Sequence, residues 1–128
     1  MMTRAIVIDA ESTMRKIVTR SLHMVGYAEV EEASSVIAAL PLLTGRPLNV
    51  IVARWELPGE RGRDVVDPLR AVDAKVPIVI YTSLAVRSVV HEAIDAGVNG
   101  ILLMPFTADT LNEKLRRYLP LQNGIVYR

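Results

Sequence analysis

Short apolar runs alternate along the chain with longer stretches in which apolar residues recur at helical spacing. Five runs have the length of strands, and they cover residues 5–8, 27–32, 50–53, 76–81 and 100–103. Four of them are almost wholly apolar and are bounded by turn residues, which is typical of strands buried on both faces of a parallel sheet. The run at 27–32 is more polar, so we expect it at an edge of the sheet.

An amphipathic stretch follows each run and predicts a helix. Candidate N-caps and glycine stops frame these stretches: Ser12 or Thr13, Ser34 or Ser35, and Thr107 as caps, with Gly26 and Gly97 as stops. Pro41 and Pro68 should shorten or strain the second and third helices. The apolar residues expected to point inward are Met14, Ile17, Val18, Leu22 and Val25; Val36, Ile37, Leu40 and Leu43; Val86, Val89, Val90, Ala93 and Ile94; and Leu111, Leu115, Tyr118 and Leu119.

A strand–helix unit repeated five times predicts an α/β fold, with one parallel sheet and helices on both of its faces. The length of 128 residues suits a single domain. We place that domain at residues 1–121 and a C-terminal tail at residues 122–128. The tail sequence QNGIVYR is too apolar for a plain solvated tail, and it could fold back on the domain or add a strand to a partner.

Composition narrows the class of protein. The net charge of +1 argues against nucleic acid or an anionic membrane as the main partner. The chain has no cysteine, which excludes disulfides, thiolate metal sites and thiol catalysis. No apolar run approaches the roughly 20 residues that span a bilayer. We therefore expect a cytoplasmic protein without a membrane partner.

Polar and charged residues stand at the carboxyl ends of the apolar runs, where ligands and chemistry collect in open α/β sheets. The third run, VIVA, ends at Arg54 and continues into a loop of proline, glycine and charged residues. We therefore expect an arginine at the centre of the functional edge of the sheet. The residues at these ends are Asp9, Arg54, Thr82, Ser83, Met104 and Pro105.

Four motifs, taken in this order, resemble the receiver domain of bacterial two-component response regulators, and among these the single-domain CheY-like chemotaxis regulators. They are VIDAESTMRKIV at the first run, WELPGERG after the third, IVIYTS at the fourth and MPFT after the fifth. The resemblance extends from about Arg4 to Leu119. It implies a flavodoxin-like, doubly wound (βα)5 fold with strand order 2-1-3-4-5, and a cis peptide bond before Pro105.

A working receiver of this family transfers a phosphoryl group from a kinase histidine to its own aspartate, with Mg²⁺ held by acids at the first strand. The resemblance places Asp9 at one acid of that pair, but Ala10 stands where the second acid is expected, and Glu11 comes one step late. One remaining acid is a poor site for Mg²⁺. We expect Mg²⁺ binding to be lost and no other cofactor to be bound.

The positions that handle the phosphoryl group also depart from the family pattern. Arg54 occupies the acceptor position, Met104 stands where a lysine is expected, and Thr82 matches the hydroxyl residue. A guanidinium group stays protonated and is no nucleophile, so we expect no aspartyl phosphorylation at this site. Glu56 is the one nearby carboxylate that could be imagined as a substitute acceptor, and its position in the loop makes it a poor one.

The substitutions are compatible with one another. If Arg54 points into the pocket, Asp9 is its natural ion-pair partner, with Glu56 or Glu11 as a second. Met104 then removes the repulsion that a lysine would face and adds an apolar lid. The resulting hypothesis is a pocket held in one state by an internal Arg54–Asp9 pair.

Each pocket residue also has an ordinary structural alternative. Arg54 could face solvent, and Asp9 could cap the first helix or pair with Lys16. Thr82 and Ser83 could serve in hydrogen bonds at the end of a strand.

A charged patch on the fourth and last predicted helices marks a candidate partner surface. In the family, the face made by the fourth helix, the fifth strand and the fifth helix is the usual docking surface, and kinases also dock beside the first helix. The resemblance thus implies signalling partners (a histidine kinase, phosphotransferase or output protein), with the chain a monomer or weak dimer. A solvated face, with simple packing on the strand, is the alternative. The residues are Arg87, His91, Ile101, Lys114, Arg116 and Arg117.

Together these observations predict a degenerate receiver, or pseudo-receiver, that acts by phosphorylation-independent protein interaction and is not an enzyme. A module that binds an anion or nucleotide is the alternative, because Arg54, Arg61 and Arg63 lie on or beside the pocket loop and guanidinium groups suit phosphate. Against it, no glycine-rich phosphate cradle leads directly into a helix. An enzyme has almost no support, since paired acids, a nucleophile with a base and a metal cluster are all missing.

Overall fold

The computed structural model describes residues 2–84 and 86–120. Its elements are β1 (Arg4–Ile8), α1 (Ser12–Val25), β2 (Glu29–Ala33), α2 (Val36–Ala39), the 3₁₀ helix η1 (Leu40–Leu43), β3 (Val50–Arg54), β4 (Glu56–Leu57), β5 (Glu60–Arg61), α3 (Arg63–Val72), β6 (Ile78–Thr82), α4 (Arg87–Ala96), β7 (Gly100–Leu103) and α5 (Ala108–Arg116). The predicted tail at residues 122–128 lies outside the described residues, and a domain boundary at residue 121 stays a prediction.

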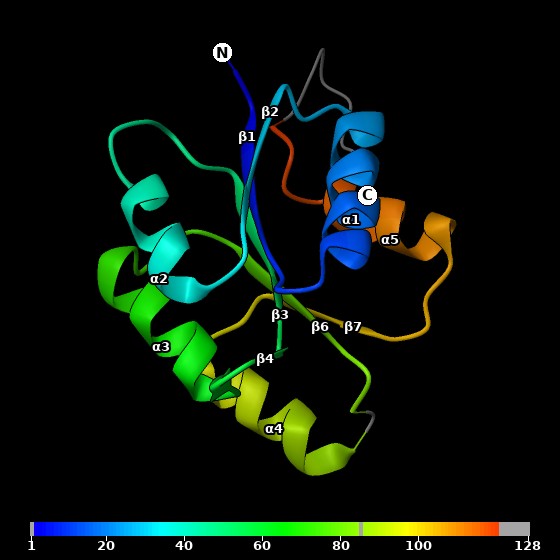
Figure 1. Cartoon of the computed structure of the whole chain (residues 1–128). Coiled ribbons are helices and arrows are strands. Elements are labelled where there is room, and N and C mark those ends of the chain that lie inside the picture. The colour runs from blue at the N-terminus through cyan, green and yellow to red at the C-terminus, as the bar shows by residue number, and fades with distance from the viewer. Residues whose placement is uncertain (1, 85, 121–128) are drawn as a thin grey trace.

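Five strands form one parallel sheet in the order β2-β1-β3-β6-β7 (Figure 1). Counted along the chain without the short strands β4 and β5, this order is 2-1-3-4-5, so the predicted (βα)5 fold and its strand order are confirmed. β2 lies at one edge, as its polar sequence predicted. The central strands β1, β3 and β6 are neighbours, and the residues that follow them meet at one edge of the sheet.

Helices cover both faces of the sheet. α1 and α5 lie on one face, and α2, α3 and α4 lie on the other (Figure 1). Successive side chains of a strand enter opposite cores, as Ile51 and Val52 do in β3. This double burial explains why the strand sequences are continuous apolar runs. Within the described ranges, no helix is both long enough and apolar enough to cross a membrane.

Some apolar residues that were predicted to point inward are exposed instead. Ile17 in α1 is 44% exposed, Ile37 in α2 is 77% exposed and Ile94 in α4 is 59% exposed, while Val86 just before α4 is 53% exposed. These predictions were wrong because each helix contacts the sheet along a stripe that is narrower than its set of apolar residues. In α1 the buried apolar stripe consists of Val18, Leu22 and Val25.

The helix starts are partly as predicted. Ser35 caps α2, because its hydroxyl oxygen accepts a hydrogen bond from the backbone N–H of Ala38 at 3.2 Å. α2 is short and passes into η1, which contains Pro41, so this proline shortens the helix as expected. At α1 the N-cap residue is Glu11, which forms no side-chain cap. Neither serine nor threonine at positions 12 and 13 caps that helix.

The segment after β3 is more ordered than the predicted loop. β4 and β5 form an antiparallel two-residue hairpin that leads into α3. Gly62 closes it with a φ of +65°, and its N–H donates to the carbonyl of Trp55 at 3.0 Å. Strands of two residues carry too few side chains to show a period, so the sequence pattern could not predict them.

A buried arginine stabilises the end of the sheet at which β1 begins. Arg4 is 3% exposed, and its Nε donates to Glu31 Oε1 at 2.7 Å. Its guanidinium group also donates to the backbone carbonyls of Leu42 and Arg46. Arg46 is itself half exposed and pairs with Glu29 and Glu31. Arg4 thus connects η1 and the segment that follows it to β1 and β2.

We predict that Arg4→Ala lowers the free energy of unfolding by about 2–4 kcal/mol, because it leaves partly buried carbonyl groups unpaired and removes an ion pair whose arginine is buried. Arg46→Ala is the matched control, with an expected loss of about 0–1 kcal/mol for exposed ion pairs. Urea denaturation of both variants measures the difference. Equal losses would contradict the role assigned to the burial of Arg4.

Candidate functional site

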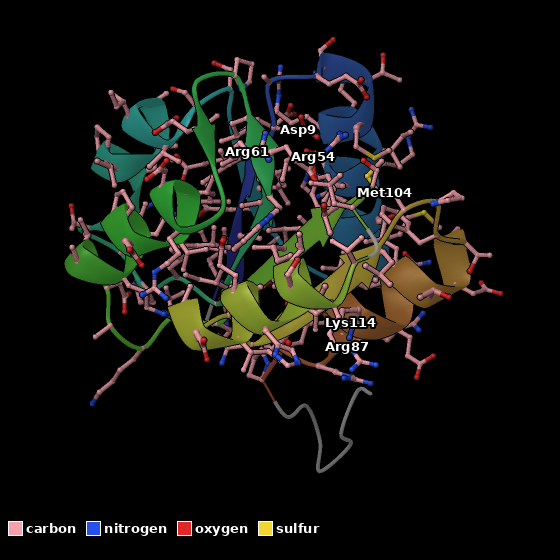
Figure 2. The ribbon with its side chains drawn as sticks, turned by 90° about the horizontal axis from the view of Figure 1, so that it is seen from below. Asp9, Arg54, Arg61, Arg87, Met104 and Lys114 are labelled. Carbon is pink, nitrogen blue, oxygen red and sulfur yellow. The ribbon has the colours of Figure 1, made fainter. Side chains whose placement is uncertain are left out.

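Three neighbouring strands bring charged and polar side chains together at their carboxyl ends. Asp9 directly follows β1, Arg54 is the last residue of β3, and Tyr81 and Thr82 end β6. Arg54 and Tyr81 are partners in the strand register, which aligns their side chains. Figure 2 shows Asp9 and Arg54 at this end of the sheet, with Met104 nearby.

Asp9 is the buried acid of the site, with 2% of its surface exposed. Its Oδ1 accepts a hydrogen bond from the backbone N–H of Glu11 at 2.9 Å. Its Oδ2 accepts a hydrogen bond from the Tyr81 hydroxyl at 2.6 Å and lies 3.6 Å from Arg54 Nη1. Both carboxylate oxygens of Asp9 therefore already have partners within the chain.

Arg54 points into the pocket, and its side chain is 19% exposed. Its Nε lies 3.1 Å from Glu56 Oε2, and its Cζ lies 5.9 Å from the centre of the Tyr81 ring. Burial works to lower the pKa of Arg54, but the hydrogen bond to Glu56 and the charges of Asp9 and Glu56 outweigh it and raise the pKa. Arg54 is thus a fixed positive charge between two acids.

Glu56 links this ion pair to the next strand. Its second carboxylate oxygen accepts a hydrogen bond from the Thr82 hydroxyl. The oxygen of that hydroxyl in turn accepts a hydrogen bond from the backbone N–H of Leu84 at 3.0 Å. Thr82 is fully buried. A continuous chain of contacts therefore runs from Asp9 through Arg54 and Glu56 to the segment between β6 and α4.

The sequence matches the family model described as the response regulator receiver domain over residues 5–116. The chain belongs to this family. Receiver domains of the CheY-like type act in two-component signalling, including chemotaxis, and the homologues found are signalling proteins of this type.

Curated relatives support the assignment of this receiver domain. It is 38% identical over 114 residues to the chemotaxis protein CheY-3 of Vibrio cholerae, a match that covers 88% of each chain. It is 34% identical over 123 residues to the chemotaxis protein CheY of Pseudomonas aeruginosa, covering 94% of this chain and 99% of that one. Among solved structures, the chemotaxis response regulator CheY4 of Vibrio cholerae superimposes with a TM-score of 0.81 at 27% identity, covering 93% of this chain and 100% of that one.

Among the predicted pocket residues of this receiver, four are joined in the network: Asp9, Arg54, Glu56 and Thr82. Arg54 takes Glu56, and not Glu11, as its second acid, because the side chain of Glu11 is exposed at the start of α1. Lys16 pairs with Glu32 and not with Asp9. The solvent-facing alternative for Arg54 is therefore wrong.

The remaining predicted pocket residues lie around the network. Ala10, Ser83 and Pro105 are exposed, and the Met104–Pro105 peptide bond is cis, as the resemblance implied. Met104 is half-buried, and it packs against the core on the α1 and α5 face. Its backbone N–H donates to the carbonyl of Thr82 at 2.8 Å, which connects the ends of β6 and β7.

Sequence reasoning missed Tyr81. Its ring is fully buried and meets Phe106 edge-on, with ring centroids 6.2 Å apart. Burial, followed by the hydrogen bond to Asp9 and the negative charge of Asp9, raises the pKa of the Tyr81 phenol well above its usual value. The hydroxyl therefore stays a donor to Asp9. The available signal was a single phenol near the end of an otherwise aliphatic strand.

Sequence reasoning also missed Arg15, which lies among the polar positions of α1. Its Nη1 donates to the backbone carbonyl of Asp9 at 2.7 Å, and its Nε lies 2.8 Å from Glu32 Oε1. Arg15 therefore fixes the turn that presents Asp9.

The residues of the anion-binding alternative do not act together. Arg54 is neutralised by its two acids, and Arg63 pairs with Asp67 at 3.3 Å within α3. Arg61 is exposed on β5. Two of the three guanidinium groups thus have acidic partners already, which weighs against a phosphate site built from this set.

The predicted partner residues lie on α4, β7 and α5, except Arg117, which directly follows α5. Arg87 and His91 are exposed on α4, whereas Ile101 is half-buried and packs against the core beneath α4. Lys114 is half-buried, and burial, followed by the positive charge of Arg117, lowers its pKa. Figure 2 shows the positions of Arg87 and Lys114. No contact in the structure tests whether these residues bind a partner, and that assignment stays a prediction.

We predict that Arg54→Ala lowers the free energy of unfolding by about 1–3 kcal/mol, because it leaves the buried charge of Asp9 with fewer partners. The matched control is Arg61→Ala at an exposed arginine, expected to change stability by about 0.5 kcal/mol or less. Urea denaturation and amide chemical shifts measure both. Unchanged stability and unchanged shifts at Asp9 and Thr82 in Arg54→Ala would contradict the hypothesis of an internally held pocket.

Proposed function

We propose that this receiver is degenerate and acts by phosphorylation-independent protein–protein interaction in two-component, phosphorelay or chemotaxis-type signalling. One observation carries the proposal: Arg54 occupies the position of the phospho-acceptor and pairs with Asp9 and Glu56. A guanidinium group has no lone pair to attack phosphorus, and it stays protonated.

The residues at the first strand do not fit Mg²⁺. Asp9 has both oxygens engaged, and its Oδ2 faces the Arg54 guanidinium. Ala10 has no ligand atom in its side chain, and the Glu11 side chain is exposed. Mg²⁺ requires near-ideal octahedral oxygen ligands and would meet a fixed positive charge here. Loss of Mg²⁺ binding is therefore part of the proposal.

The contacts among Arg54, Glu56 and Thr82 could take the place of those that a phosphoryl group makes in a working receiver. In a working receiver, the hydroxyl residue after the fourth strand holds an oxygen of the phosphoryl group. Here the Thr82 hydroxyl donates to the carboxylate of Glu56, a group that belongs to the chain. Met104 places an apolar side chain where a lysine would repel Arg54. We infer that the segment from Thr82 to Leu84 is held in one arrangement without phosphorylation.

A fixed pocket is useful to a protein that presents a surface at all times. Receiver domains interact with signalling proteins, and we propose a histidine kinase, a phosphotransferase or an output protein as the partner. The proposed docking face lies on α4, on α5 and at the residue that follows α5, beside the half-buried Ile101. Its charged or polar residues are Arg87, His91, Lys114, Arg116 and Arg117.

We predict that incubation with Mg²⁺ and acetyl phosphate gives no adduct by intact mass, and that Mg²⁺ with beryllium fluoride gives no amide shifts at the pocket. The positive control is the combined variant Ala10→Asp, Arg54→Asp and Met104→Lys, which restores the family residues and is expected to respond. An added phosphoryl group on the wild type would overturn the proposal and make Glu56 or another acid the acceptor.

The interaction part has its own test. In pull-downs against purified histidine kinase and phosphotransferase domains, we expect a binder that needs no phosphoryl donor and loses about tenfold in affinity for Lys114→Glu combined with Arg117→Glu. The control combines Lys75→Glu with Arg61→Glu, which reverses two exposed charges elsewhere. An equal loss in both double variants would contradict the docking face, and binding that requires a phosphoryl donor would contradict the proposed function.

A further inference from the structure

Two adjacent residues of β6, Tyr81 and Thr82, contact different acids of the pocket from opposite faces of the sheet. The Tyr81 ring lies in the core beneath α1 and α5, together with Leu111 of α5. Side chains alternate along a strand, so Thr82 points to the face that α2, α3 and α4 cover. Tyr81 donates to Asp9, and Thr82 donates to Glu56. The two acids of the pocket are therefore connected to different layers of helices.

Tyr81 contacts the pocket and the segment before α5 at the same time. Its hydroxyl donates to Asp9 Oδ2 at 2.6 Å, and Arg54 Cζ lies 5.9 Å from the centre of its ring. The same ring meets Phe106 edge-on, with the centroids 6.2 Å apart and the planes at 83°. Because Tyr81 is fully buried in a close-packed core, its ring cannot reorient without displacing these neighbours.

Phe106 directly precedes the residue that caps α5. That cap is Thr107, whose hydroxyl oxygen accepts a hydrogen bond from the backbone N–H of Thr110 at 3.1 Å. The carbonyl of Thr107 accepts another from the N–H of Leu111, also at 3.1 Å. Phe106 is half-buried and packs against the core that contains Tyr81. A displacement of Phe106 therefore alters the first turn of α5.

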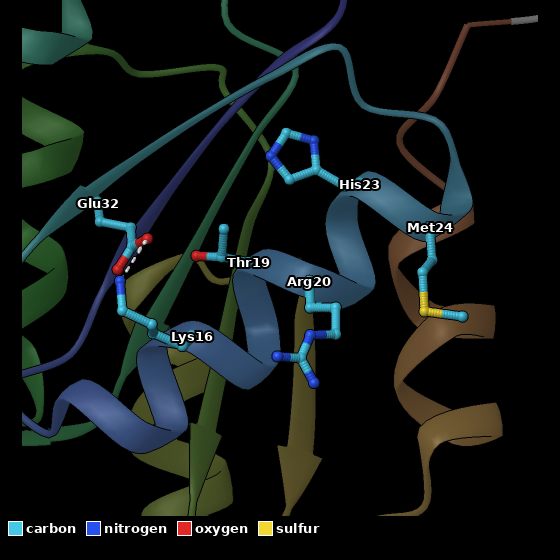
Figure 3. A pocket seen from close by; sticks show the side chains of 6 residues that line it. All are labelled: Lys16, Thr19, Arg20, His23, Met24 and Glu32. Atoms are coloured by element: carbon cyan, nitrogen blue, oxygen red, sulfur yellow. Dashed lines mark ion pairs between the residues drawn. The ribbon is translucent and has the colours of Figure 1, made fainter.

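The main chain at Asp9 is held by contacts of its own. Its N–H donates to the carbonyl of Ala33 at 3.1 Å, and its carbonyl accepts from Arg15 Nη1 at 2.7 Å. Arg15 is fixed in turn by Glu32, and Lys16 lies 3.7 Å from the second carboxylate oxygen of Glu32; Figure 3 shows this Lys16–Glu32 pair. When the charge beside Asp9 changes, the adjustment therefore falls on its carboxylate and on the hydroxyl that the carboxylate holds.

We propose that Tyr81 is a positioning residue that couples the charges of the pocket to the first turn of α5, separately from the contacts that lead through Thr82 toward α4. A change of charge beside Asp9 alters the hydrogen bond from the phenol, and the ring then moves against Phe106. These steps require neither a phosphoryl group nor a metal ion, so the coupling can be tested independently of the proposed function. Only its consequence, that the pocket influences the proposed docking residues on α5, rests on that function.

Amide chemical shifts of the full chain test the coupling, because they report local structure in the folded protein and do not follow stability alone. Tyr81→Phe removes the hydroxyl and retains the ring. We expect it to shift the amides of residues 9–11 and 106–111, and to leave those of Leu84 and residues 86–90 nearly unchanged. Thr82→Val is the matched control, since it removes a hydroxyl on the opposite face, and we expect the reverse pattern. The same set of shifts in both variants would overturn the proposal.

A double-mutant cycle measures the coupling itself. Arg54→Ala in the otherwise native chain should shift the amides of residues 106–111, and in the Tyr81→Phe background these shifts should fall by about threefold or more. The shifts that Arg54→Ala causes at Leu84 should persist in that background, because Glu56 and Thr82 transmit them. Equal shifts at residues 106–111 in both backgrounds would overturn the proposal.

Phe106→Leu decides the question if Tyr81→Phe does not fold. It keeps an apolar side chain at a half-buried position and leaves the hydrogen bond between Tyr81 and Asp9 in place. In this variant Arg54→Ala should still shift the amides of residues 9–11, but its effect on residues 107–111 should fall by about threefold or more. An undiminished effect there would mean that α5 responds by another route, and it would overturn the proposal.

Discussion

The charge of a carboxylate that is almost fully buried must be balanced by hydrogen bonds or by an opposite charge. Asp9 is such a carboxylate, and the other groups at this edge of the sheet are arranged around it. The backbone of Glu11, the phenol of Tyr81 and the guanidinium of Arg54 meet it from three different segments. Arg54 needs a second acid in turn, which Glu56 supplies while it also accepts from Thr82. Each group satisfies its neighbour, so changing one member leaves another buried and unpaired.

In the function proposed above, the charge that balances Asp9 belongs to the covalently attached Arg54 and not to an exchangeable metal ion. A metal ion and a phosphoryl group can enter and leave, so a site that uses them has two charge states. The Arg54 side chain stays protonated at every accessible pH, because a guanidinium group has a high pKa and its acidic neighbours raise that pKa further. Under the proposed function, the loops after β1, β3 and β6 would meet the same charge distribution with or without a phosphoryl donor. Such a pocket would suit a protein that presents one surface at all times.

The fold could be predicted from the sequence because strands buried on both faces are continuous apolar runs, whereas the amphipathic helices repeat their apolar residues at helical spacing. The pair of Asp9 and Arg54 was also predictable, since both stand at the ends of neighbouring parallel strands. Tyr81 was not, because a tyrosine within an apolar strand looks like core until the position of its hydroxyl is known. The contacts of Arg15 and the exposure of Ile17 could not be predicted for a related reason. Helical spacing shows which residues of α1 share a face, but it does not show how closely each face packs against β2.

The glutamates of β2 have a consequence for the behaviour of the protein in concentrated solution. β2 is an edge strand, so its outer backbone groups could pair with the edge of another molecule. Glu29, Glu31 and Glu32 are each held by arginine or lysine side chains from neighbouring segments. Any approaching strand would have to strip water from these charges and displace their partners. The ion pairs that stabilise the first two strands therefore also disfavour the addition of a strand from another molecule at that edge.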